Sequence, residues 1–164
     1  MKKILILTLL VTIFVVGCNK MNYNTPTSKV EDFLGKYQKL DKTVLNDLKN
    51  MIDKEKMTEE EKKEYQVLLE KQYQNLSYKI KNEIIKKDMA TVDVEIEVLD
   101  YTQGISKAKK DCEEENIVSC KIKEMKLINS KVKHDITFTL YNEEGNWIIE
   151  KLENEDIKKL HGLY

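Results

Sequence analysis

The sequence contains no arginine, because all 28 basic residues in its 164 positions are lysine. Arginine is the side chain that grips phosphate and carboxylate groups through two parallel hydrogen bonds, so recognition of that kind is excluded. The 28 lysines are balanced by 29 acidic residues, which leaves no excess of positive charge for a nucleic-acid partner. We therefore predict that the chain does not bind DNA or RNA.

The chain is also poor in the residues that build common catalytic motifs. Its five glycines are scattered, so neither a glycine-rich phosphate loop nor a Gly-x-Ser-x-Gly nucleophile elbow occurs. The two histidines, His134 and His161, are distant in sequence from the Cys112 and Cys120 pair, whose spacing matches no common zinc site. We expect no catalytic residue, no metal site and no cofactor.

One long apolar run stands out, from Ile4 to Val16, directly after Lys2 and Lys3. A helix rises only ~1.5 Å per residue, so this run is too short to cross a bilayer core of ~30 Å comfortably. A short positive segment followed by an apolar run of this length is typical of a secretory signal peptide.

The apolar run ends in Val15-Val16-Gly17-Cys18, which resembles the lipobox of bacterial lipoproteins. The resemblance implies transfer of a diacylglyceryl group, with palmitate-like chains, to Cys18 and cleavage after Gly17. Two acyl chains anchor a protein stably, whereas one binds only marginally. We predict a lipoprotein signal peptide at 1–17 and a lipid anchor on the extracytoplasmic face of the cell membrane. A lipidated cysteine and short polar tether follow at 18–25, and the seven residues after Cys18 span at most ~25 Å.

Residues 26–164 are expected to form a single domain that opens with three helices. Thr25 and Pro26 favour the start of the first helix, as cap and first helical residue. Asp41 is placed to cap the second helix, and Thr58 with Glu61 forms a capping box before the third. Apolar residues recur at helical spacing after each start.

The apolar period changes to two after residue 75, which predicts strands. Two hairpins are expected: 76–84 with 90–98, turning at Lys87-Asp88, and 132–141 with 147–152, joined by the loop 142–146. The polar segment 102–131 is expected to hold helical pieces near 105–115 and 121–129. Asn154 is expected to cap a closing helix that stops at Gly162.

Helices followed by four antiparallel strands predict an α+β fold with the N-terminal helices packed on a curved sheet. This order resembles the NTF2-like, or cystatin-like, cone. Several segments also resemble uncharacterised small lipoproteins of low-GC Gram-positive bacteria: Thr25-Pro26 with Val30-Glu31-Asp32-Phe33-Leu34, the Gly145-Asn146-Trp147 turn and the closing segment 156–164. That family implies no assigned activity.

Cys112 and Cys120 lie eight positions apart in a chain predicted to be exported, where disulfides persist. A bridge between them would close a short loop and stabilise the fold by roughly 2–3 kcal/mol in the chain-entropy model. Two free thiols are the alternative. We expect the disulfide.

A possible pocket follows from the predicted strand phases. Tyr78, Asn82 and His134 are expected to point toward the sheet interior, and Trp147 is a further candidate for its lining. Proton abstraction in an NTF2-like cone needs an acid or base inside an apolar pocket, and only His134 could serve. A histidine that fills space in the core is the reading we favour.

The sequence therefore predicts a membrane-anchored, non-enzymatic accessory or binding domain of the cell envelope, with no ligand or protein partner specified. Two alternatives stay open. One is an NTF2-like enzyme that acts on a small apolar substrate through His134. The other is a structural partner of another envelope protein, docking by the polar face of its sheet.

Overall fold

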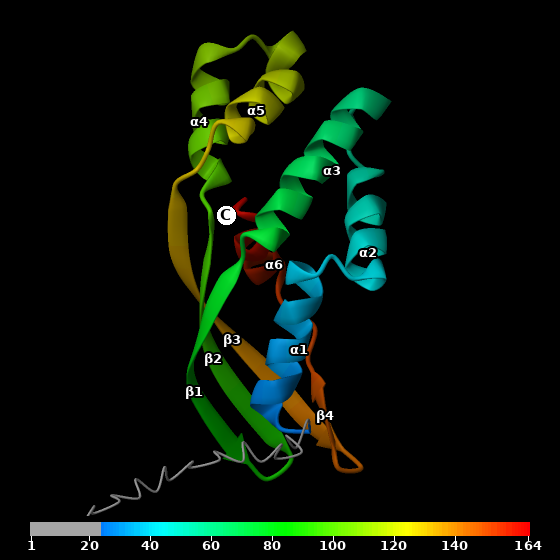
Figure 1. Cartoon of the computed structure of the whole chain (residues 1–164), viewed down its shortest axis with the longest axis vertical. Helices are drawn as coiled ribbons and strands as arrows, with labels where there is room; N and C mark the ends of the chain where they lie inside the picture. Colours follow the sequence, from blue (N-terminus) through cyan, green and yellow to red (C-terminus); the bar gives the residue numbers. More distant parts are fainter. Residues whose placement is uncertain (1–23) are drawn as a thin grey trace, which may run out of the picture.

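The computed structural model describes residues 24–164, which form six α-helices, one short 3₁₀ helix and one four-stranded antiparallel sheet (Figure 1). The helices pack against the sheet, so the predicted α+β class is confirmed. The predicted signal peptide, the lipobox with Cys18 and most of the tether lie outside the described residues.

The first three helices begin where the capping residues predict. They are α1 (Pro26–Gln38), α2 (Lys42–Ile52) and α3 (Glu59–Gln74). The Thr25 side chain accepts a hydrogen bond from the backbone of Ser28, and Asp41 accepts one from Thr43. Thr58 and Glu61 form the predicted capping box. These caps satisfy backbone N–H groups that lack a partner within the helix.

The sheet has the strand order β1-β2-β3-β4, with β1 (Ser77–Lys86), β2 (Met89–Leu99), β3 (Lys131–Glu143) and β4 (Asn146–Ile149). The turn between β3 and β4 is only Glu144-Gly145, and both residues have positive φ (50° and 86°). Such a turn matches the twist of paired strands, so β3 runs further than predicted. The last strand is correspondingly shorter than the predicted 147–152.

The segment between β2 and β3 folds as α4 (Tyr101–Asp111), a 3₁₀ turn (Glu114–Asn116) and α5 (Ile117–Lys126). Both helices begin about four residues before the predicted pieces. The chain closes with α6 (Asn154–His161), which ends at Gly162 with φ 68°, as predicted. Asn154 is the first helical residue rather than the cap, a position held by Glu153.

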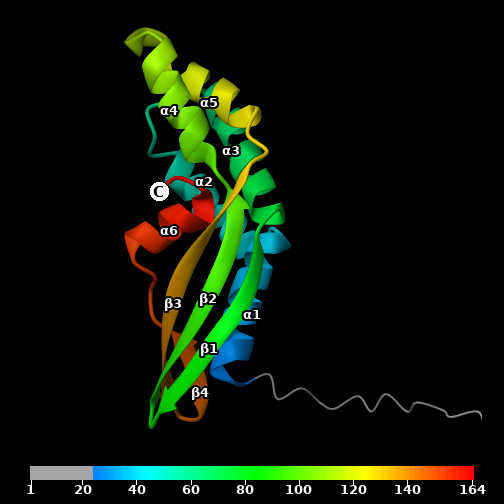
Figure 2. The ribbon, with the colours of Figure 1, turned by 90° about the vertical axis from the view of Figure 1, so that its left-hand side faces the viewer.

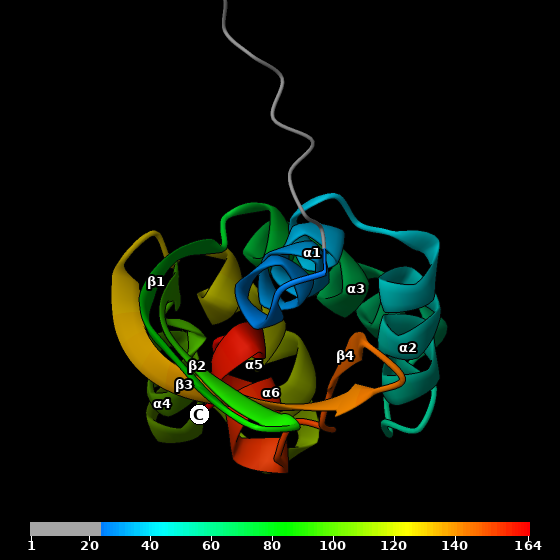
Figure 3. The same cartoon turned by 90° about the horizontal axis from the view of Figure 1, so that it is seen from below.

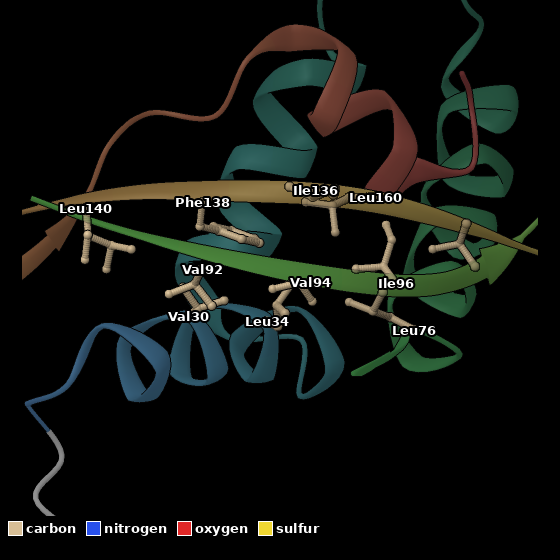
Figure 4. Packing of buried hydrophobic residues seen from close by; sticks show 12 residues of the cluster. Val30, Leu34, Leu76, Val92, Val94, Ile96, Ile136, Phe138, Leu140 and Leu160 are labelled. Atoms are coloured by element: carbon tan, nitrogen blue, oxygen red, sulfur yellow. The ribbon is translucent and has the colours of Figure 1, made fainter. Parts of the chain in front are cut away.

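Two adjoining apolar clusters hold these elements together. In the first, α1, the inner faces of β2 and β3, and Leu160 of α6 pack on one another (Figure 4). Seen from below, the sheet is curved, with α1 on its concave side (Figure 3). The second cluster joins α2, α3, α4 and α5, and Tyr37 of α1 contacts both clusters. The two clusters therefore stabilise one continuous body.

One strand departs from its predicted phase. In β1 the pairing shifts between Ile80 and Asn82, since Ile80 lies opposite Val94 and Asn82 opposite Asp93. This is a β-bulge at Lys81, and one extra residue reverses the direction of every side chain beyond it. Asn82 and Ile84 therefore lie on the outer face, and the prediction that Asn82 points inward is wrong.

Candidate functional site

The molecule is elongated, and its two ends differ in structure (Figures 1 and 2). At one end, called the helical end here, lie α4, α5 and the facing parts of α2 and α3. At the other, the hairpin end, lie the turns Lys87-Asp88 and Glu144-Gly145 and the start of α1. Hydrogen bonds tie these parts together, because the N–H of Asn142 donates to the carbonyl of Asp88 (2.8 Å) and Asn24 bonds to Gly145.

The helical end contains a cavity of about 610 Å³, which we call the helical cleft. Its lining comes from the loop after α2, from α3, α4 and α5, and from the C-terminal segment: Lys54, Glu55, Lys56, Met57, Tyr65, Ile105, Val118, Lys121, Ile122, Met125 and Leu163. Its volume falls in the range of roughly 300–1,000 Å³ that is typical of small-molecule sites.

The walls of the helical cleft are mainly apolar. Ile105 of α4 and Val118 of α5 are partly exposed there, above the buried Ile122 and Met125. The two helices meet closely because residue 104 is glycine: a Cβ at this position would lie 2.8 Å from the backbone nitrogen of Met125. This close approach fixes the position of the α5 side chains that form one wall.

Tyr65 brings a polar group into this apolar wall. Burial raises the pKa of its hydroxyl to about 12, and the negative charge of Glu55 acts in the same direction. The phenol therefore stays protonated at neutral pH and can donate a hydrogen bond to a bound molecule.

The rim of the helical cleft carries Lys54, Lys56 and Lys121, with Glu55 as its one acid. Within residues 24–164, none of these three lysines takes part in an ion pair. Two lysines outside the lining are paired, Lys107 with Glu124 (2.7 Å) and Lys126 with Glu64 (2.9 Å). The rim therefore has a net positive charge that faces an apolar interior.

Cys112 and Cys120 lie where α4 ends and α5 begins. The structure joins them in a disulfide, with Cα atoms 6.5 Å apart. Cys112 is the C-terminal cap of α4 and Cys120 lies in the first turns of α5. The bridge thus connects the two helices that form one wall of the helical cleft, and its formation in the cell stays a prediction.

The four residues predicted to line a pocket do not come together. Tyr78 is partly buried beside the first apolar cluster, and Trp147 lies on β4 at the hairpin end, opposite Asn142. Asn82 is exposed on the outer face, where its amide donates to Asp93 (3.5 Å). His134 and Tyr78 both lie opposite Ile96, on its two sides, so strand β2 separates them. The physical reasons are the bulge in β1, the intervening strand β2 and the position of Trp147 at the hairpin end.

His134 sits beneath the C-terminal residue. Its ring meets that of Tyr164 edge to face, with centroids 4.0 Å apart, and its buried Nε2 has no hydrogen-bond partner among the described residues. Burial lowers the pKa of His134, and the positive charge of Lys159 lowers it further. His134 is therefore neutral at pH 7, and it does not line the helical cleft.

Sequence reasoning missed the helical cleft. Four of its apolar lining residues lie in the polar segment 102–131, where periodicity is weak, and nothing about Ile105 or Val118 distinguishes them from ordinary core residues. The close approach of α4 to α5 depends on Gly104, which was one of five scattered glycines in the sequence.

Within 24–164, no group of three or more His, Cys, Asp or Glu side chains is arranged to hold a metal ion. No helix in that range has both the length and the apolar character needed to cross a bilayer. Comparison of the chain with protein-family models, with curated proteins and with solved structures finds no match.

Proposed function

We propose that the chain is a lipoprotein held by lipid on Cys18 at the extracytoplasmic face of the cell membrane. Its domain would be a non-enzymatic binding domain whose helical cleft takes a small apolar molecule bearing an anionic group. The observation that carries the binding role is the cleft itself, with its apolar walls and its rim of unpaired lysines.

The anchor is supported by three features of the sequence that agree. Lys2 and Lys3 provide the positive start, the apolar run has the length of a signal peptide, and Gly17-Cys18 completes a lipobox-like ending. The described domain begins at Asn24, so only a few residues separate it from Cys18. A chain anchored in this way remains close to the membrane surface.

The chemistry of the helical cleft favours an amphiphilic ligand. Ile105, Val118 and Met57 offer apolar surface to a ligand. Burying such surface stabilises the bound state in proportion to the area removed from water. A carboxylate or phosphate at the rim would meet the ammonium groups of lysines such as Lys56 and Lys121. Lysine attracts such a group as a point charge, so this recognition does not need the arginine fork that the chain lacks.

A binding role also fits the polar groups that face the helical cleft. General acid–base catalysis works best with a pKa near the working pH. The pKa of Tyr65, the polar group within the wall, is moved away from neutrality, to about 12. The lysines and Glu55 lie at the open rim, in contact with water. Their net positive charge there favours a ligand with an anionic group.

The test uses mature protein in detergent and three single-chain probes of equal length: decanoate, decanol and decyltrimethylammonium. Calorimetry should show saturable binding of decanoate, weaker binding of decanol and the weakest binding of the cation. Val118→Asp places a charge in the apolar wall and should abolish binding. Val67→Asp is the matched control, because Val67 is 63% exposed on α3 and outside the lining.

The lysine rim is tested with the double variant Lys56→Gln/Lys121→Gln. It should weaken decanoate binding several-fold and leave decanol binding unchanged. The proposed ligand class would be wrong if all three probes bound equally, or if Val118→Asp bound decanoate like the unmodified protein.

A further inference from the structure

The exposed large apolar side chains of the described domain gather at its hairpin end. The described residues include eight such side chains, and five of them form a group that we call the tip patch: Ile84, Ile85, Met89, Tyr141 and Ile148. Their exposed fractions range from 37% to 58%. Single exposed apolar residues are ordinary on protein surfaces, but a contiguous group is a mark of an interaction site.

Strand register places four of these side chains on one surface. Met89 lies opposite Tyr141, and Tyr141 lies opposite Ile148, so the three form a row across β2, β3 and β4. Ile84 faces the same way, since it pairs with Thr91, which lies two residues from Met89 on the same side of β2. Ile84 and Met89 also line a hollow of about 290 Å³.

The bulge in β1 is what brings Ile84 to this surface. Without the extra residue at Lys81, Ile84 would face inward in phase with Ile80. Ile85 would then face outward, whereas it now lies on the inner face, opposite the buried Ala90. The apolar surface therefore extends around both sides of the hairpin end.

The rest of the outer face of the sheet is polar. Glu95 bonds to Lys81 (2.7 Å) and to Lys133 (2.9 Å), and Thr137 donates to Asp93 (2.7 Å). These pairs satisfy the charged groups that cover the middle of the sheet. The apolar residues begin where the polar pairs stop, toward the turns of the hairpin end. This end lies opposite α4 and α5 in the elongated molecule (Figure 1).

The chain also enters the domain at this end. The Asn24 side chain donates to the carbonyl of Gly145 and accepts a hydrogen bond from the backbone N–H of Trp147 (3.4 Å). Cys18 lies six positions before Asn24, so the two are separated by at most ~22 Å of extended chain. A lipid on Cys18 thus keeps the hairpin end within reach of the bilayer.

We propose that the tip patch contacts the bilayer that holds the lipid of Cys18. The domain then stands with its hairpin end on the membrane and its helical cleft directed away from it. This inference rests on the lipid anchor of the proposed function. It adds a second attachment point and hence a defined orientation.

The charges around the tip patch indicate the kind of contact. Lys86 and Lys87 are outnumbered by Asp88, Glu143 and Glu144 in the two turns. Attraction to anionic lipid is therefore not the driving force, and apolar insertion is. Tyr141 supplies a side chain with an apolar ring and a polar tip, the type that favours the membrane interface.

The experiment uses lipidated mature protein in phosphatidylcholine vesicles with and without brominated acyl chains, which quench tryptophan at short range. Trp147 is the single tryptophan, so Trp147→Phe supplies a background into which one new tryptophan is placed. Met89→Trp probes the tip patch. Leu127→Trp is the matched control, because Leu127 is 62% exposed and follows directly after α5 of the helical end.

We expect brominated lipid to quench the tryptophan at 89 several-fold more than the tryptophan at 127. Adding Ile84→Ser and Ile148→Ser should remove most of that quenching, while adding Val67→Ser should leave it unchanged. Replacing a third of the lipid by phosphatidylglycerol should not increase it, since the contact is apolar.

Equal quenching at 89 and 127 in lipidated, vesicle-bound protein would overturn the orientation and leave the anchor intact. A blue-shifted but unquenched tryptophan at 89 would also overturn it, because it would show a protein surface covering the patch. Protein that carries no lipid on Cys18, read from its mass before reconstitution, would overturn both the anchor and the inference.

Discussion

Trp147 donates its backbone N–H to the side chain of Asn24 across 123 positions of sequence, at 3.4 Å. The same side chain donates to the carbonyl of Gly145, so residue 24 is fastened to the β3–β4 hairpin by both ends of its amide. The point where the tether meets the domain is thus fixed relative to the sheet. A short tether that meets a fixed point restricts how the domain can sit above a membrane.

The disulfide between Cys112 and Cys120 is open to direct test. Mature protein should have an intact mass lower than its reduced form by two hydrogen atoms. Reduction should lower the free energy of unfolding by roughly 2–3 kcal/mol, the chain-entropy value for a loop of this size. Urea unfolding with and without reductant measures the difference. The variant Cys112→Ala/Cys120→Ala should be insensitive to reductant, and alkylation of both thiols in non-reduced protein would contradict the bridge.

Gly162 closes α6 in a conformation that only glycine adopts without strain. Its φ is 68°, and a Cβ there would overlap the carbonyl oxygen of Leu99 and lie 2.7 Å from Nε2 of Gln72. The buried Gln72 side chain pairs with both the N–H (2.9 Å) and the carbonyl (3.4 Å) of Leu99. Gly162→Ala should therefore cost roughly 2–4 kcal/mol, from backbone strain plus displacement of these buried hydrogen bonds.

Gly35 provides the control for this substitution. It lies in α1, and a Cβ there would meet nothing within 4 Å. Gly35→Ala should stabilise the protein by up to about 1 kcal/mol, because alanine is the better helix former. Urea midpoints that moved equally for both variants would contradict the role assigned to Gly162.

Stability should fall as the pH is lowered from 6.5 to 4. Burial against Tyr73 lowers the pKa of His161 from 6.5 to about 4. In that interval the unfolded chain binds a proton that the folded protein does not, so acid favours unfolding. The difference between the two pKa values corresponds to roughly 3 kcal/mol in the free energy of unfolding. This contribution is fully present above pH 6.5 and is lost as the pH falls to 4. The lowered pKa of His134 acts in the same direction.

Unfolding by urea at a series of pH values between 4 and 8 measures the slope of the unfolding free energy against pH. His161→Gln should reduce the slope below pH 6.5 to the part contributed by His134 and the carboxyl groups. A slope that is identical in the variant and the unmodified protein would show that His161 titrates normally when folded.

His134 is predicted to be structural. Its Nε2 is buried without a partner in the described part of the chain, and its ring packs on Tyr164. His134→Gln should change stability by roughly 0.5–3 kcal/mol, the usual range for single substitutions. It should still complement a deletion of the gene at normal protein abundance. Failure to complement by a folded, membrane-bound variant would favour the enzyme alternative.

Much of the fold could be predicted because local signals and apolar periods agree. Thr25, Asp41 and Thr58 cap helices where expected, and the alternation of β2 places its aliphatic side chains in the core. The α+β class follows from the order of these elements. Such signals depend only on residues a few positions apart, which makes them readable in a single sequence.

The missed features depend on contacts between distant segments. The bulge at Lys81 reverses the outer half of β1, and it is set by pairing with β2 rather than by any local motif. The helical cleft arises where α3, α4 and α5 meet around Gly104. The residues of the predicted pocket stay apart for related reasons. Asn82 turns outward beyond the bulge, β2 runs between Tyr78 and His134, and Trp147 lies at the hairpin end.

The most direct test of the account is the mass of the N-terminal peptide of the protein purified from the membrane fraction. We expect a peptide that begins at Cys18 and carries a diacylglyceryl group, with residues 1–17 removed. Cys18→Ala should accumulate as unprocessed precursor and leave the detergent phase. An unmodified Cys18, or a Cys18→Ala variant that is processed and partitions like the unmodified protein, would contradict the lipid anchor.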